Sequence, residues 1–221
     1  MNDVNELPNL IQLIIFGLLI GLFPFIAILS TSFVKLIVVF HMLRNALGIQ
    51  QSPPNMVLNG IAIIITVFIM APIGMEIKDT FKEEGISLED YKNPNYLNAL
   101  EKSSQPLVGF LKRNTTPEDK KFFIDTTKKL WPKKYHEKAT ENNLLILMPA
   151  FVISELTSAF KIGFLIYLPF VIIDMVIANI LLALGMMMMS PVTVSTPFKL
   201  LLFVLVEGWL GLLQGLILSY Q

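Results

Sequence analysis

The sequence contains no cysteine among its 221 residues, and charged side chains are scarce. The absence of cysteine excludes disulfides, thiolate metal sites and a cysteine nucleophile. Charged residues make up 15% of the chain and hydrophobic residues 54%, and the mean hydropathy is +0.64. This composition is too apolar for an ordinary soluble domain, so lipid or other hydrophobic helices must cover much of the surface.

An excess of one charge sign is also missing, because 17 Lys and Arg residues balance 17 Asp and Glu residues. A protein that binds nucleic acid usually carries a basic excess on the binding surface. The sequence therefore predicts no nucleic-acid partner.

Recognisable catalytic motifs are missing as well. His136-Glu137 begins like a zinc-protease helix, but Thr140 occupies the position of the second histidine that this motif requires. The other histidine, His41, lies on a different segment, and the sequence has neither a Walker-type phosphate loop nor a GxGxxG string. We therefore expect no enzyme, no cofactor and no metal site.

The chain does contain four long apolar stretches, which cover residues 10–43, 56–75, 144–188 and 192–220. A transmembrane helix needs about 20 apolar residues, so each stretch is long enough to cross a bilayer. The sequence thus predicts an all-α membrane-associated protein of long, broken helical hairpins with four hydrophobic segments.

The stretch 144–188 is too long for a single span, because a helix rises about 1.5 Å per residue and the hydrocarbon core is about 30 Å thick. Proline removes a backbone hydrogen bond, and charges are unfavourable in lipid. We therefore expect this stretch either to break or to lie partly outside lipid, with a break marked by Glu155, Lys161, Gly163 and Pro169 and a span after Gly163.

Most charged residues lie between Glu76 and Glu141, which divides the chain into three predicted parts. These are a hydrophobic hairpin (1–75), a polar helical region (76–143) and a second hydrophobic hairpin with a Met-rich loop (144–221). The short connection near Arg44 carries a basic excess, which favours a cytoplasmic location for it and an extracytoplasmic one for 76–143.

A helix from Pro117 to about Trp131 is predicted within the polar region. Thr116 is a suitable N-cap, Pro117 is favoured at the first helical position, and the following acids suit the positive end of the helix dipole. Pro132 ends this helix.

Three charges stand out within the apolar stretches: Lys35, Asp174 and Glu207. Each would cost about 2.5–3.5 kcal/mol at the centre of a bilayer. They are expected to face protein or water, either in an ion or proton pathway or in pairs between helices or subunits. With only three such charges, pairing is the preferred interpretation.

Two small-xxx-small patterns predict close helix packing, and they consist of Gly17 with Gly21 and Gly211 with Gly215. The same segments hold groups that need protein partners, namely Pro24, Pro169 and Asn179. We therefore expect a subunit that forms a homo-oligomer.

Four consecutive methionines lie at the end of the third stretch, and they are Met186, Met187, Met188 and Met189. Methionine is unbranched and deformable, so these residues suit either gap-filling at a helix end or a compliant hydrophobic constriction of a pore. Composition alone favours gap-filling and does not decide the question.

Three groups of strings together resemble the FliP/SctR family of type III secretion systems. The first group comprises Thr31-Ser-Phe-Val-Lys35, Arg44-Asn-Ala-Leu-Gly48 and Gln50-Gln-Ser-Pro-Pro-Asn55. The second comprises Pro149-Ala-Phe-Val-Ile-Ser-Glu155, Ala159-Phe-Lys-Ile-Gly163 and Tyr167-Leu-Pro-Phe170. The third comprises Asp174-Met175, Gly185 to Pro191, and Pro197-Phe-Lys199 through Glu207-Gly-Trp209. The polar region matches no family motif.

The resemblance implies a core subunit of the export gate in the bacterial inner membrane, through which unfolded secreted proteins pass. It also implies a pentamer that assembles with two small hydrophobic export-apparatus subunits, largely above the membrane plane. In this family the methionine stretch lines the pore constriction, and the matching residues here are Met186, Met187, Met188 and Met189.

The branch of the family is also indicated by particular residues. Phe33-Val-Lys35, Arg44-Asn45, Ser190-Pro191 and the lack of a recognisable signal peptide resemble the virulence injectisome branch rather than the flagellar one.

Other functional classes fit the residues less well. A small-molecule channel or secondary transporter would need paired repeats or several polar sites at the membrane midplane, and the sequence shows neither. An intramembrane enzyme would need convergent His, Asp or Ser residues at helical spacing.

Overall fold

The computed structural model describes residues 10–49, 51–83 and 96–221, and it confirms the all-α prediction, because no strand occurs in these ranges. The acidic segment before the first apolar stretch lies outside the described residues. The helices are α1 (Leu10–Leu29), α2 (Phe33–Ala46), α3 (Asn55–Glu83), α4 (Tyr96–Ser103), α5 (Gln105–Arg113), α6 (Pro117–Leu130), the 3₁₀-helix η1 (Lys133–Lys138), α7 (Leu144–Ala183), α8 (Pro191–Leu205) and α9 (Gly208–Leu218).

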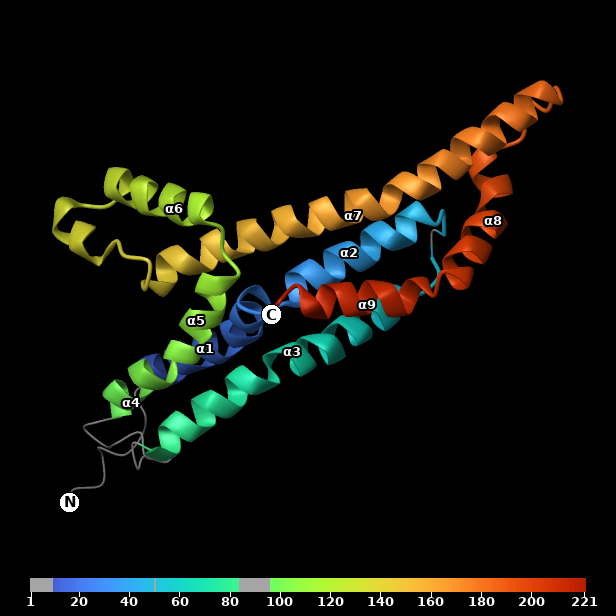
Figure 1. Cartoon of the computed structure of the whole chain (residues 1–221). Helices are drawn as coiled ribbons and strands as arrows, with labels where there is room; N and C mark the ends of the chain where they lie inside the picture. The colour runs from blue at the N-terminus through green and yellow to red at the C-terminus, as the bar shows by residue number, and fades with distance from the viewer. Residues whose placement is uncertain (1–9, 50, 84–95) are drawn as a thin grey trace, which may run out of the picture.

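The molecule is elongated, and α7 runs along most of its length (Figure 1). Helix α2 packs along α7, α3 packs on α2, and α9 returns beside α2 and α3 (Figure 1). One apolar core joins these four helices, and its buried members are Leu36, Val39, Phe40, Leu58, Ala62, Ile65, Ala159 and Leu216.

The predicted break in the third stretch is wrong, because α7 is one continuous helix of 40 residues. Pro149 and Pro169 lie inside it. Prolines are tolerated in such helices where neighbouring helices and local adjustments satisfy the freed backbone groups. Gly163 marks no break either: it is buried against Met42 of α2, where an added Cβ would lie only 2.2 Å from the Met42 sulfur.

The breaks lie at two other points. The first apolar stretch divides between α1 and α2 at residues 30–32, and the last divides between α8 and α9 with a bend of 62°. Among the described residues, α3 and α7 are long and apolar enough to cross a membrane, and the bent pair α8 and α9 raises the number to three at most. All four predicted hydrophobic segments are helical, and the number that crosses the lipid stays a prediction.

The polar region forms α4, α5, α6 and η1 at one end of the molecule (Figure 1). The predicted helix at Pro117 is confirmed as α6, and the Thr116 hydroxyl accepts a hydrogen bond from the Asp119 backbone N–H (3.2 Å). Phe110 and Leu111 of α5 join a second apolar core with α3 and α7. Helix α3 continues past residue 75, the predicted end of the first hairpin, to Glu83. The division of the chain into three parts and the extracytoplasmic location of residues 76–143 stay predictions.

Candidate functional site: buried ion pairs and an exposed methionine loop

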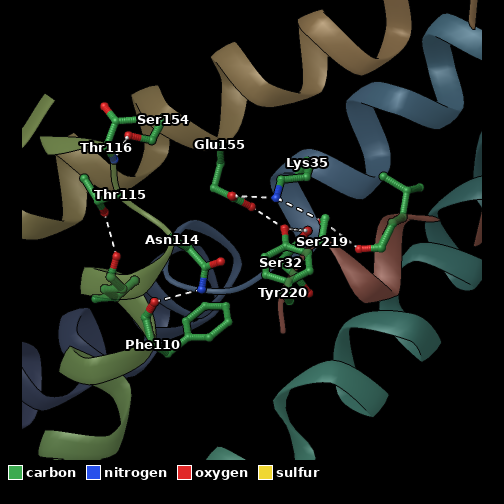
Figure 2. Close-up of polar contacts among 12 residues, drawn as sticks. Ser32, Lys35, Phe110, Asn114, Thr115, Thr116, Ser154, Glu155, Ser219 and Tyr220 are labelled. Atoms are coloured by element: carbon green, nitrogen blue, oxygen red, sulfur yellow. Dashed lines mark hydrogen bonds and ion pairs between the residues drawn. The ribbon is translucent and has the colours of Figure 1, made fainter. Parts of the chain in front are cut away.

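Lys35 of α2 and Glu155 of α7 form an ion pair inside the apolar bundle (Figure 2). The ammonium nitrogen of Lys35 lies 2.9 Å from Glu155 Oε1, and the two side chains are 4% and 2% exposed. A charge this deeply buried requires an opposite charge and further hydrogen bonds. Glu155, which the sequence analysis treated only as a marker of a break, is the partner of Lys35.

Tyr220, which follows α9, completes this buried site. Its hydroxyl donates a hydrogen bond to Glu155 Oε2, and the Lys35 ammonium lies 3.9 Å from the centre of its ring (Figure 2). A tyrosine hydroxyl is protonated at neutral pH, so it is the donor in this contact. Ser219 Oγ accepts a further hydrogen bond from Lys35 at 3.5 Å.

A polar pocket of about 330 Å³ opens beside the pair. Its lining comes from the turn between α5 and α6 and from the facing side of α7, and it includes Arg113, Asn114, Thr115, Thr116, Ser154 and Ser158. Ser154 Oγ accepts a hydrogen bond from the Thr116 backbone N–H (3.0 Å) and donates one to Asp119. The polar region is thus fixed to α7 next to the ion pair.

A second ion pair lies nearer the other end of α7. Asp174 accepts a hydrogen bond from Lys199 of α8 at 2.6 Å and another from Ser195. Lys199 also donates to the backbone carbonyl of Ala46 (3.1 Å), so this contact joins α2, α7 and α8. Sequence reasoning did not identify Lys199 as the partner of Asp174, although an Asp within an apolar stretch needs a basic partner and Lys199 is the base in the following stretch.

The third flagged charge, Glu207, is in a different situation. It lies in the joint between α8 and α9, has an exposed side chain and adopts the left-handed conformation with φ 51°. Lys35 and Asp174 therefore have partners within this chain, whereas the Glu207 side chain faces outward. Contacts between subunits at any of the three stay a prediction.

The four packing glycines make no close contact with another helix of the described residues. Within that part of the chain, a Cβ added at Gly17, Gly21, Gly211 or Gly215 would meet no atom within 4 Å, although Gly211 lines an apolar pocket with Leu43 and Phe170. Their role in helix packing therefore stays a prediction.

The methionine loop joins α7 to α8 at the tip of the molecule farthest from α4 (Figure 1). A turn at Gly185, which has φ 73°, reverses the chain there. The exposed fractions of Met186, Met187, Met188 and Met189 are 40%, 81%, 101% and 45% in that order.

This exposure limits where the methionines can pack. Met187 and Met188 fill no gap within the described part of this chain, because both side chains project almost fully out of the molecule, and gap-filling at a helix end against other chains stays a prediction. Met186 and Met189 are also exposed rather than packed in a core. A constriction would require neighbouring copies of the loop, so the pore role of all four methionines stays a prediction.

Comparison with known proteins agrees with the sequence resemblance. The FliP family matches residues 16–216. This chain belongs to the FliP family. Yop proteins translocation protein R of Yersinia pestis is 51% identical to it over 215 residues, which cover 97% of this chain and 98% of that protein.

Two further FliP-family relatives come from other pathogens. Hypersensitivity response secretion protein HrcR of Ralstonia nicotianae is 44% identical over 210 residues, which cover 95% of this chain and 97% of that protein. Virulence protein YscR of Salmonella typhimurium is 44% identical over 211 residues, covering 96% and 97%. The predicted injectisome branch of the FliP family is thereby confirmed, and the long apolar helices fit its inner-membrane location.

Proposed function

We propose that this FliP-family chain is a pore-forming core subunit of the type III secretion export gate, which conducts unfolded proteins across the bacterial inner membrane. The main support is the near-full-length identity to proteins named for translocation and secretion. The role is one of transport and structure rather than catalysis.

The methionine loop supplies the constriction in this proposal. Its four thioether side chains are exposed at the end of a long helical hairpin, so they are free to meet the same loops of neighbouring copies around a common axis. Met187 and Met188 are the most exposed of the four and would project farthest toward that axis. Methionine side chains are flexible and apolar, so they pack on one another and repack around varied side chains in transit.

The assembly that we propose is a pentamer of this chain with two small hydrophobic export subunits. The glycine faces of α1 and α9 support this assembly because small residues let helices of neighbouring chains approach closely. The many exposed apolar side chains on α3, α7 and α8 support it because they are unsuited to contact with water. A small-molecule transporter subunit would also expose apolar side chains, but it would have no role in protein secretion.

Deleting the gene in the native bacterium tests the function. We expect the type III substrates to disappear from the culture medium and to return when the wild-type chain is supplied. Export of a periplasmic enzyme by the general secretory pathway serves as the control and is expected to stay unchanged. Normal type III secretion after deletion would contradict the proposal and favour a transporter.

A further inference from the structure

The ring of Tyr220 lies where α2, α5, α7 and the segment after α9 meet (Figure 2). It stacks on Phe110 of α5, with ring centroids 5.8 Å apart and an interplanar angle of 18°. Its hydroxyl contacts Glu155 of α7 and lies 3.5 Å from the backbone carbonyl of Ser32, just before α2. One side chain therefore connects the polar region with both hydrophobic halves of the chain.

Two hollows of opposite character lie beside this end of the chain. Ser219, which precedes Tyr220, lines the polar pocket beside the ion pair. Tyr220 itself lines an apolar groove between α3 and the end of α9, together with Phe68 and Pro72. Lys35 and Glu155 line the polar pocket, so the Tyr220 ring covers the pair on the other side, toward the groove, and removing the ring would let water reach Lys35 from that side as well.

Ser32 lies directly behind this ring, so the accessibility of its side chain indicates whether the ring is in place. Its side chain has no exposed area, and within the described residues its Oγ is a buried polar atom without a hydrogen-bond partner. A thiol placed here would stay hidden from a charged reagent for as long as Tyr220 covers it.

We infer that Tyr220 is a positioning residue that closes the groove side of the Lys35–Glu155 pair to water and holds α5 and α9 against α2 and α7. Its ring supplies most of this effect, because both the stacking on Phe110 and the contact with the Lys35 ammonium use the ring face. The hydroxyl adds a donor to a carboxylate that already has Lys35 as its partner.

The absence of native cysteine permits a direct test in the full-length chain purified in mild detergent. Ser32→Cys replaces one small side chain by another of similar shape, and a charged thiol reagent then measures access to it. Ser103→Cys is the matched control, because Ser103 is also buried (2% exposed) but lies in α4.

We expect Tyr220→Ala to raise the labelling rate at position 32 by about tenfold or more and to leave the rate at position 103 unchanged. Tyr220→Phe keeps the ring and is expected to stay within about twofold of the parent at both positions. In cells, Tyr220→Phe is expected to retain secretion and Tyr220→Ala to lose most of it.

Two results would overturn the inference. An unchanged rate at position 32 in Tyr220→Ala would show that the ring does not exclude water. Faster labelling at both positions would show a general loss of structure rather than a local closure. Because the labelling is independent of secretion, its outcome is separate from that of the proposed export function.

Discussion

Lys35 and Glu155 are charged residues inside an apolar bundle, and their mutual contact makes this tolerable. Glu155→Leu would leave Lys35 buried without its carboxylate, which costs about 3–5 kcal/mol in comparable buried pairs. We expect this variant to unfold at markedly lower temperature in detergent, as followed by circular dichroism. Lys161→Met, on an exposed position of the same helix, is expected to change little.

The double variant Lys35→Met with Glu155→Leu distinguishes the cost of an unpaired buried charge from the cost of losing the Glu155 side chain itself. Replacing both charges by apolar groups removes the unpaired ion, so much of the lost stability is expected to return. A double variant no more stable than Glu155→Leu alone would contradict the account of the pair.

The sequence shows which charged residues need a partner more readily than it shows which residues those partners are. Lys35 and Asp174 are recognisable because each interrupts an apolar stretch. Their partners are far away in the sequence, at Glu155 and Lys199, and a pairing over such a distance depends on how the helices pack. No sequence pattern indicated a role for Tyr220, because a tyrosine near a helix end is common and its contact with the ion pair appears only in the folded structure.

The joint between α8 and α9 bends the chain by 62°. Gly208 lies so close to the Phe203 ring that an added Cβ would be 2.2 Å from a ring carbon. We expect Gly208→Ala to destabilise the protein by about 1–3 kcal/mol through overpacking, as measured by thermal unfolding in detergent.

A smaller side chain at position 203, which faces Gly208, tests this explanation. Phe203→Leu with Gly208→Ala is expected to be more stable than Gly208→Ala alone, because a smaller side chain leaves room for the methyl group. Gly60→Ala in α3 is the control, since no atom of the described residues lies within 4 Å of its added Cβ. If both alanine variants behave alike, the contact with Phe203 does not constrain the joint.

Helix ends with local chemistry were predictable, and breaks within long apolar stretches were not. Thr116 and Pro117 define the start of α6 through their own side chains, so the sequence contains the whole signal. Gly163 and Pro169 suggested a break in α7, but packing against α2 keeps that helix continuous. The actual bend after Val206 brings Gly208 against the Phe203 ring, a contact that no local pattern shows.

The whole molecule is a long helical hairpin assembly whose core is small for its surface. Many large apolar side chains stay exposed along α3, α7 and α8, and the loop of Met186, Met187, Met188 and Met189 forms one tip. Such a chain is unsuited to exist alone in water, which fits a subunit that neighbouring copies, partner subunits and lipid surround.

Ion conductance of the inner membrane tests the proposed seal most directly. Cells would carry the assembled complex with the four loop methionines all changed to Ala, all changed to Leu, or left unchanged. Met175→Ala, an exposed methionine on α7 outside the loop, serves as the control. We expect the Ala loop to leave assembly intact and to raise ion leakage several-fold, because small side chains leave a wetted gap. We expect the Leu loop and the control to stay closed. An Ala-loop complex that assembles normally and conducts no more than the parent would contradict the claim that these methionines close the gate.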